Sequence, residues 1–417
     1  MQIETPDSKR PLIGQAELIA MVGLLMSLNA MAIDIFLPAL DDIGEALGSA
    51  GNERQLIVSA YLIGFGVGQV FMGPLTDALG RRRVLIISIS AYALTSFLCA
   101  LSPSLAFLIF ARFLQGLAAA GTRVVVTAVV RDLVSGRRMA QIMSFAMTVF
   151  MVAPLLAPAL GELVLYVSYW RMIFMVLVAF SAVMIVWALL RLPETLPQPK
   201  RMPLDLGAAF NAYREVMQSR ITMGYTAAAI SVFAALYLFL ATSEQVLAEL
   251  YGLEHLFALA FAAISFGLAV TSLLNARFVR RFGMRRISHW GLVMFVLVNM
   301  VHALVAYFGD PPFWAFFLLL SLSTAVFATL SANFSAIVME PAGDKAGTVG
   351  AFYGSTTSVF AALLGAIIGQ FYNGSVFPIV VGYALLGLGG LALVFWTERG
   401  RLFGVGEAIG EAAESQN

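Results

Sequence analysis

Three charged residues, Asp34, Arg112 and Arg123, stand inside long runs of otherwise apolar sequence. If these runs cross a bilayer, each charge costs at least ~2.5–3.5 kcal/mol at the centre of a helix, so each is a functional hypothesis by default. A buried carboxyl near an arginine is balanced between two effects, because burial disfavours its charged form and the guanidinium favours it. Such a carboxyl can take up and release a proton near neutral pH. We therefore predict that Asp34 and Arg112 carry proton coupling.

Asp34 and Arg112 are expected to lie at matching depths. Asp34 precedes Asp41 by seven residues, about 10 Å of helix, and Arg112 lies about 12 Å beyond Pro103 by the same rise. Arg112 and Arg123 are eleven residues apart, almost three helical turns, so both point to one side of their helix. The alternative is that Asp34 and Arg112 only neutralise each other and hold two helices together. Arg123 is equally open to a structural interpretation.

The runs that hold these charges indicate an all-α membrane protein. Apolar residues make up 60% of the chain and charged residues 12%, whereas soluble domains have about 45–50% apolar residues. A dozen runs approach the ~20 residues that cross a ~30 Å hydrocarbon core, which favours helices over the shorter strands of a barrel. The expected spans are 17–39, 55–76, 84–103, 105–130, 139–165, 172–190, 222–243, 256–276, 288–308, 313–335, 348–371 and 376–396.

The positions of the basic residues predict the orientation of the chain. Placing both termini in the cytoplasm leaves only Arg54 and Arg171 in outer loops and assigns the other loop lysines and arginines to the inside. This asymmetry is the positive-inside rule, and an odd number of spans would scatter it. The sequence therefore predicts an even span count with both termini cytoplasmic.

The longest polar interruption divides the chain into two related halves. Asp77–Arg83 follows the second expected span and Arg280–Arg286 follows the eighth, and the two basic turns are 203 residues apart. Matching turns at matching places indicate a duplicated six-helix unit, a plan that puts a substrate site near the midplane between the halves. The expected parts are an N-terminal six-helix bundle at 1–190, a cytoplasmic linker at 191–220, a C-terminal six-helix bundle at 221–397 and a cytoplasmic tail at 398–417.

Four motifs resemble those of one transporter family. They are Gly73-Pro-Leu-Thr-Asp77-Ala-Leu-Gly80-Arg81-Arg82-Arg83 after span two, Asp34 with Pro38 in span one, Arg112-Phe-Leu-Gln115-Gly116 in span four, and Ala157-Pro158-Ala-Leu-Gly161-Glu162 in span five. Together they resemble the major facilitator superfamily, and within it the twelve-span drug:proton antiporters of the bicyclomycin-resistance-like (Bcr/CflA) branch. In the span-five motif, Ala157 and Glu162 stand where that family usually has glycine.

The resemblance implies a fold of two pseudo-symmetric six-helix bundles and a function in proton-coupled drug efflux by alternating access. It implies a bacterial-type inner (plasma) membrane, a small-molecule substrate, protons as the coupling ion and a monomer. It also implies a gating role for seven residues, namely Gly73, Asp77, Gly80, Arg81, Asp132, Pro158 and Gly161. Arg81 is expected to pair with Asp132, and Asp77 to face the start of span eleven near Thr348. The alternative is that the charges of the loop only set topology.

Adaptable apolar and polar side chains predict a substrate cavity, because methionine and phenylalanine fit ligands of varied shape. The candidates are Met26, Asn29, Met31, Gln115, Arg123, Phe145, Met147, Tyr237, Phe239 and Phe360. Such residues are more often lipid-facing or core, and that interpretation stays open. Glu244 and Glu162 fall at the outer ends of spans, where we expect solvation.

The sequence offers no enzyme chemistry. It has no Gly-Lys pair for a phosphate-binding loop, no histidines at metal-ligand spacing and no Gly-x-Ser-x-Gly elbow. We therefore expect no catalytic residues, no metal, no cofactor and no nucleic-acid partner. Two functions remain beside drug efflux, a dedicated transporter of one metabolite on the same scaffold and a non-transporting membrane receptor. The receptor leaves the buried charges without a purpose.

Overall fold

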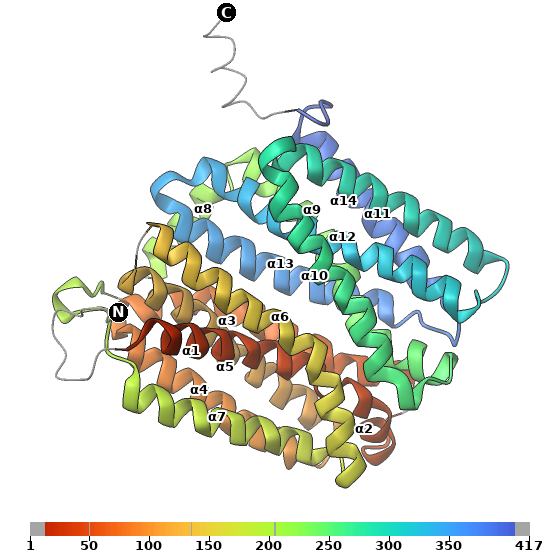
Figure 1. Cartoon of the computed structure of the whole chain (residues 1–417), viewed down its shortest axis with the longest axis horizontal. Coiled ribbons are helices and arrows are strands. Elements are labelled where there is room, and N and C mark those ends of the chain that lie inside the picture. The colour runs from red at the N-terminus through yellow and green to blue at the C-terminus, as the bar shows by residue number, and fades with distance from the viewer. Residues whose placement is uncertain (1–12, 50, 135, 204–205, 405–417) are drawn as a thin grey trace, which may run out of the picture. The chain divides into compact units, whose positions relative to one another are not determined.

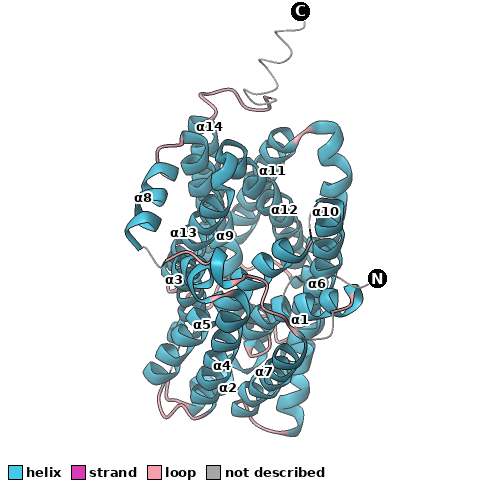
Figure 2. Ribbon diagram, turned by 90° about the vertical axis from the view of Figure 1, so that its left-hand side faces the viewer, coloured by secondary structure: helices cyan, strands magenta, loops and turns pink. Residues whose placement is uncertain are grey.

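The computed structural model describes residues 13–49, 51–134, 136–203 and 206–404, and within these ranges the fold consists of helices joined by loops and turns (Figure 2). Twelve helical segments of this part of the chain are long and apolar enough to cross a membrane, which confirms the all-α membrane fold. The termini at 1–12 and 405–417, including most of the predicted tail, lie outside the described residues.

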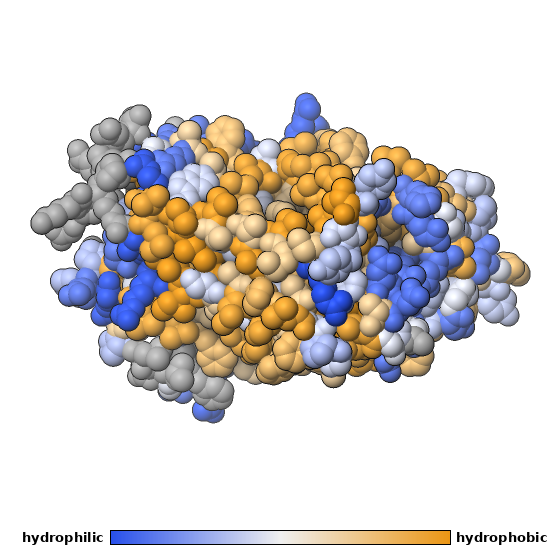
Figure 3. Space-filling view, turned by 90° about the horizontal axis from the view of Figure 1, so that it is seen from below, coloured by the Kyte–Doolittle hydropathy of each residue, from blue (hydrophilic) through white to orange (hydrophobic). Residues whose placement is uncertain are grey.

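The surface agrees with a membrane-spanning fold. Figure 3 shows a broad hydrophobic area with hydrophilic residues gathered on either side of it. Large apolar side chains are exposed along many helices, including Leu94, Phe110, Leu163 and Leu304. Such exposure would be costly in water but is expected where hydrocarbon is the solvent.

The chain divides into two compact units. Unit 1 comprises residues 1–209 and 253–262, and unit 2 comprises residues 210–252 and 263–417. The division falls within a short helix of the predicted linker. The predicted boundaries at 190, 220 and 397 remain predictions.

Unit 1 holds the first six spans (Figure 1). Here α3 packs on α5, α5 on α4, α4 on α7 and α1 on α6, around a core that includes Leu25, Ile89 and Val129. The helices are α1 (Gln15–Asp34), α2 (Leu40–Ala46), α3 (Leu56–Leu79), α4 (Arg81–Ala100), α5 (Leu105–Leu133), α6 (Gly136–Val167) and α7 (Arg171–Arg191).

Unit 2 holds the remaining long helices. Its core, with Tyr225, Leu330 and Phe334 fully buried, lies where α9 contacts α12, α13 and α14. The helices are α8 (Leu206–Val216), α9 (Arg220–Glu244), α10 (Phe257–Phe282), α11 (Met284–Tyr307), α12 (Phe313–Met339), α13 (Ala346–Gly369) and α14 (Phe377–Thr397). The first residues of α8 and of α10 belong to unit 1.

The first span differs from its expected form, because α1 ends at Asp34 and not at residue 39. A 3-10 turn, Leu37–Ala39, follows, with Pro38 at its start, and α2 then continues the span to Ala46. A proline lacks the backbone N–H that a continuous helix would use, so Pro38 favours a break at this point. The break leaves Asp34 at a helix end.

Glycines let α3 and α5 approach closely. A Cβ atom added to Gly64 would lie 2.0 Å from the carbonyl O of Phe113, and one added to Gly116 would lie 2.0 Å from the carbonyl O of Tyr61. Small residues at such crossings allow backbone-to-backbone packing, which drives helix association where no hydrophobic effect operates between helices. Gly116 therefore serves the close packing of α5 on α3.

The two basic turns have the same backbone conformation. Gly80 precedes α4 with φ 97° and ψ 150°, and Gly283 precedes α11 with φ 80° and ψ 153°. Both angles lie in a region that glycine adopts readily and other residues rarely do. Glycine at Gly80 suits this conformation, and the match at Gly283 agrees with a duplicated unit.

Candidate functional site

Arg112 is the most deeply placed charge of unit 1, with none of its surface exposed. Its Nη2 donates to the carbonyl O of Ala32 (2.9 Å), its Nε to the carbonyl O of Ile57 (3.3 Å) and its Nη1 to Oε1 of Gln115 (2.6 Å). Charge-assisted hydrogen bonds of this kind are about twice as strong as neutral ones. The guanidinium therefore fastens α1, α3 and α5 together at one point.

Two aromatic rings pack against this guanidinium. The centroids of Phe36 and Tyr61 lie 4.3 and 4.5 Å from Cζ of Arg112. A cation over a ring face is attracted by ~0.5–2 kcal/mol, more where water is excluded. The rings and the three acceptors together account for a buried arginine without an acidic partner.

Asp34 is buried as predicted, with 4% of its surface exposed. The expected ion pair with Arg112 is not formed, and none of the ion pairs between described residues includes Asp34. Arg112 instead reaches the carbonyl of Ala32, two residues before the carboxyl. Three of the guanidinium's five N–H donors bind the carbonyl oxygens of Ala32 and Ile57 and the amide oxygen of Gln115, and the Asp34 carboxyl is not among the acceptors.

The α6 helix packs directly against the chain break that follows Asp34. A Cβ atom on Gly161 would lie 2.0 Å from the carbonyl O of Ile35 and 3.1 Å from Cγ of Pro38. Pro158 is buried one turn earlier in the same helix. The span-five motif and the acidic first-span motif therefore meet at the residues next to Asp34.

Two of the predicted cavity residues belong to buried polar networks. Tyr61 Oη donates to Oδ1 of Asn29 (3.0 Å), and Asn29 Nδ2 donates to Oγ1 of Thr122 (3.2 Å). Gln115, which accepts from Arg112, donates its Nε2 to Oγ of Ser96 (2.7 Å). Buried polar groups need such partners, so Asn29 and Gln115 have a structural role in this conformation.

The predicted cavity set does not form one buried surface. Met26, Asn29, Gln115 and Phe239 are buried, Met31 and Tyr237 are half-buried, and Arg123, Phe145, Met147 and Phe360 are exposed. Seven of the ten belong to unit 1, and Tyr237, Phe239 and Phe360 belong to unit 2. The cavity remains a prediction. Arg123 also differs from Arg112 in exposure, although both lie on α5.

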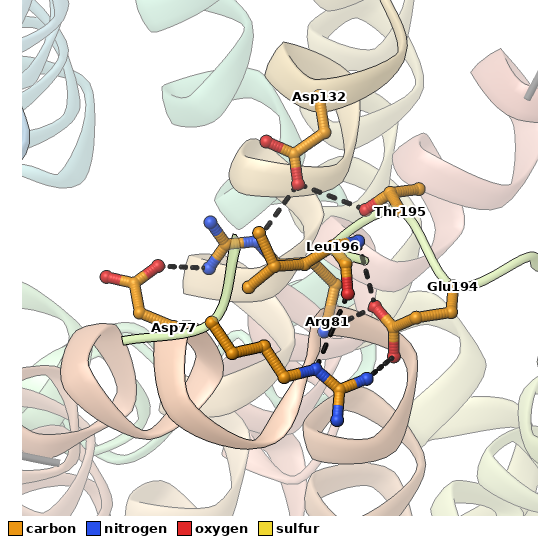
Figure 4. Close-up of polar contacts among 7 residues, drawn as sticks. Asp77, Arg81, Asp132, Glu194, Thr195 and Leu196 are labelled. Carbon is orange, nitrogen blue, oxygen red and sulfur yellow. Dashed lines mark hydrogen bonds and ion pairs between the residues drawn. The ribbon is translucent and has the colours of Figure 1, made fainter. Parts of the chain in front are cut away.

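The basic turn before α4 holds a compact charge network (Figure 4). Arg81, 4% exposed, donates its Nη1 to Oδ1 of Asp77 (2.6 Å) and its Nε to Oδ2 of Asp132 (3.0 Å). The expected pair of Arg81 with Asp132 is therefore formed. Gly73, the other glycine of this motif, has open space where a Cβ would stand.

The segment after α7 joins the same network, which the sequence did not predict. Glu194 Oε1 accepts from the backbone N–H of Arg81 (2.8 Å), and Thr195 Oγ1 donates to Oδ2 of Asp132 (3.0 Å). The N–H of Met202 donates to the carbonyl O of Asp77 (3.2 Å). We call residues 194–202 with these partners the linker clasp. It fixes the start of the linker to the signature loop.

Unit 2 repeats this arrangement around Arg285. Its Nε lies 2.9 Å from Oε1 of Glu398 and its Nη2 lies 2.7 Å from Oε2 of Glu340. Glu340 follows α12 as Asp132 ends α5, and Glu398 follows α14 as Glu194 follows α7. Tyr225 Oη also donates to Glu398 (2.7 Å). The sequence indicated only the basic turns, because the acids that form ion pairs with them lie far along the chain.

Two acids that we expected to be solvated are not. Glu244, at the end of α9, is 3% exposed and precedes a six-residue π-helix, Gln245–Leu250. Glu162 is half-buried and accepts from the N–H of Ala258 (2.8 Å), in the first turn of α10. A π-helix inside a span often marks a functional position. The expectation of solvation was wrong because a position near the end of a span does not determine which parts of the chain pack against it.

The sequence model of the Major Facilitator Superfamily matches residues 22–366, well over half of the chain. The chain belongs to this superfamily. It is therefore a membrane transporter of the superfamily and not an enzyme.

Curated relatives of this superfamily member cover most of its length. A bicyclomycin resistance protein homolog of Haemophilus influenzae is 27% identical over 91% of this chain and 95% of its own length. Multidrug resistance protein D of Escherichia coli is 26% identical over 84% of this chain and 88% of its own length. These relatives agree with the bicyclomycin-resistance-like branch that the motifs indicated.

Solved structures agree on the fold. The inward-open xylose transporter XylE of Escherichia coli superposes with a TM-score of 0.70, at 15% identity, over 93% of this chain and 97% of its own. The nucleoside transporter NupG gives a TM-score of 0.68 at 17% identity over 92% and 99%. At such identities the likeness concerns the fold alone.

Gly80→Ala is expected to loosen the linker clasp. The new Cβ would lie 2.5 Å from Oε2 of Glu194 and 2.8 Å from Nη2 of Arg201, so these side chains must move. Trypsin cuts after Lys200 and Arg201, and its rate there tracks local opening. We expect cleavage of the purified protein to become about fivefold faster, as ~1 kcal/mol implies.

Gly283→Ala is the matched control for this change. Gly283 has nearly the same positive φ, but nothing lies within 4 Å of its Cβ position. The two variants therefore share the backbone strain and differ only in the contact with the linker. Equal cleavage rates after Arg201 in both would show that Gly80 does not position the linker.

Proposed function

We propose that this transporter exports small apolar or amphipathic drugs in exchange for protons, by alternating access. The observation that carries the proposal is the burial of Asp34 at a break in the first span, with no cation bound to its carboxyl in the described chain. Burying an ionised carboxyl without a partner is costly, so its ionisation favours a conformation that admits water. Proton release and a change of access are thereby linked.

The surroundings of Asp34 suit a moving part. The span is interrupted at Leu37–Ala39, and α6 approaches the interruption through Gly161. A broken helix with a small residue against it can shift without disrupting a regular helix pair. Arg112 anchors the residues just before the break, so movement is expected beyond Ala32 and not before it.

The gating role of the signature loop belongs to this proposal. Arg81 binds Asp77 within the signature loop and Asp132 at the end of α5, and the linker clasp joins the start of the linker to the same loop. The two glycines of the loop are Gly73 and Gly80. Breaking and reforming such an ion-pair network is a common element of two-state switches. The approach of Asp77 to the helix start near Thr348 remains part of the proposal.

The names of the relatives support drugs as substrates, since they record multidrug and bicyclomycin resistance for those proteins. We place the protein in a bacterial-type inner membrane with both termini cytoplasmic, in accordance with the distribution of basic residues. The other candidate, a dedicated transporter of one metabolite, uses the same scaffold and differs only in substrate range.

Resistance profiling combined with vesicle transport tests the proposal. Cells that produce the protein are expected to tolerate several unrelated toxic compounds, and an uncoupler is expected to remove that tolerance. Inverted vesicles with an acidic interior are expected to accumulate the same compounds until the pH gradient is collapsed. Tolerance of one compound alone would favour the dedicated transporter, and accumulation that ignores the pH gradient would overturn proton coupling.

A further inference from the structure

An open groove of about 500 Å³ lies within unit 2, between the end of α10, the first turns of α11 and the facing part of α12. Its walls are apolar, with Leu274 and Phe278 on α10 and Ile287 and Trp290 on α11. Pockets of about 300–1,000 Å³ that are mostly apolar and carry a few polar groups are the usual form of small-ligand sites. Neither the transport cycle nor the predicted cavity makes use of this groove.

Two polar residues that line the groove, Thr271 and Asn275, make hydrogen bonds from α10 to α12. The amides of Asn275 and Asn333 exchange two hydrogen bonds of 3.1 and 3.0 Å, and Thr271 Oγ1 donates to the carbonyl O of Ala325 (2.5 Å). These polar groups satisfy one another, so they leave little for a ligand to bind deep in the groove. An occupant must match the apolar walls and the charge at the rim.

The walls are exposed at membrane depth. Leu274, Phe278 and Trp290 are 46%, 43% and 55% exposed. They belong to the membrane-spanning segments Glu254–Phe282 and Met284–Tyr307, close to the ends that meet at Gly283. Tryptophan prefers this boundary between hydrocarbon and headgroups. The groove therefore begins at headgroup level and runs into the hydrocarbon region.

Arg286 supplies positive charge at the rim of the groove. It is exposed, and in the described part of the chain no acid pairs with it, because Glu340 and Glu398 are both bound by Arg285. The first backbone N–H groups of α11 lie at the same end and add partial positive charge. This end is suited to an anion whose remainder is apolar.

We propose that the groove binds one anionic phospholipid of the surrounding bilayer. Its phosphate contacts Arg286 and the start of α11, and one acyl chain lies along Phe278, Leu274 and Trp290. Basic pockets between transmembrane helices commonly hold anionic headgroups. A zwitterionic lipid carries an amine that offsets its phosphate, so Arg286 selects against it.

Fluorescence quenching by brominated lipid tests this site on the full chain. The purified protein is placed in nanodiscs of phosphatidylcholine with increasing amounts of phosphatidylglycerol whose acyl chains are brominated. Bromine quenches a tryptophan that it touches, and the difference between the wild type and Trp290→Phe isolates the signal of Trp290. We expect quenching to saturate at a low fraction of phosphatidylglycerol.

Arg286→Gln is expected to raise the phosphatidylglycerol fraction at half-quenching about fivefold, the effect of one arginine at a membrane surface. Arg286→Lys keeps the charge and is expected to stay near the wild type. Arg280→Gln removes another exposed arginine, one that does not line the groove, and it is the matched control. Identical curves for Arg286→Gln and Arg280→Gln, or equal quenching by brominated phosphatidylcholine, would overturn the site.

The measurement needs no transport and no substrate. A transporter that fails the drug and proton tests can still show selective quenching, and a proton-coupled exporter can lack it. The result for the lipid site is therefore independent of the result for the proposed function.

Discussion

Asp34→Asn is expected to abolish substrate-dependent proton movement in inverted vesicles while the protein still binds substrate. Asparagine nearly matches the size of the carboxyl but cannot ionise, so it imitates the protonated form permanently. A variant held in that form can still change conformation without carrying a proton. Fluorescence of a pH-sensitive dye outside the vesicles, recorded when substrate is added, measures the loss.

Asp42→Asn is the matched control for Asp34→Asn. Asp42 is an exposed acid eight residues along the same segment, so removal of its charge is expected to leave coupling unchanged. Asp34→Glu restores an ionisable group and is expected to recover part of the proton movement. Full coupling in Asp34→Asn would reject this carboxyl as the proton carrier.

The pH dependence of substrate binding gives a second view of the same variant. If substrate and proton favour opposite states of Asp34, linkage makes the wild-type affinity rise with pH, by at most about tenfold per pH unit for one proton. The Asp34→Asn variant is expected to bind, at every pH of the same range, with the weaker affinity of the protonated wild type. Calorimetric titration in detergent at several pH values measures both slopes.

Much of the fold could be predicted because membranes constrain sequence strongly. A span must be long, apolar and helical, so twelve runs gave twelve membrane-crossing helical segments in the described chain. The pair of Arg81 with Asp132 could be predicted as well, from the family resemblance. The fine structure of span one could not. A proline can either kink a helix or break it, and the sequence does not say which occurs at Pro38.

The direction in which a side chain points was harder to predict than its depth. Depth along the helices suggested that Asp34 and Arg112 would meet, yet the guanidinium is bound by Ala32, Ile57 and Gln115. Every residue has a backbone carbonyl, so the sequence could not indicate that the carbonyls of Ala32 and Ile57 would be the acceptors. The predicted cavity residues show the same problem, because the residue type does not say in which direction a side chain points. Phe145 is exposed, whereas Phe239 is buried.

Glu194 shows a third limit, which concerns distance along the chain. Its carboxylate binds the N–H of Arg81, more than a hundred residues away, through a contact that only the packed helices create. Pro193 and Glu194 look like ordinary linker residues in the sequence. The same reasoning applies to Glu398 and Arg285, so the second network was found only from the structure.

Arg112→Lys is expected to lower the free energy of unfolding by about 2–4 kcal/mol and to remove transport. Lysine keeps the charge, but its ammonium has no planar fork and cannot reach three separate acceptors. The carbonyls of Ala32 and Ile57 and the amide of Gln115 would then lose a charged donor in a fully buried place. Each buried acceptor left unsatisfied costs ~1–3 kcal/mol. Unfolding in detergent with increasing denaturant measures the change.

Arg123→Lys is the matched control, since Arg123 lies on the same helix but is exposed. We expect it to unfold within about 0.5 kcal/mol of the wild type, as exposed substitutions usually do. Arg112→Met removes both the charge and the donors at similar length, so its comparison with Arg112→Lys, which keeps the charge, separates the contribution of the charge from that of the fork. If the donors matter, both Arg112 variants are destabilised. If Arg112→Lys were as stable as the wild type, the charge alone would suffice, and the fork that joins α1, α3 and α5 would not be what holds the residues before Asp34 in place.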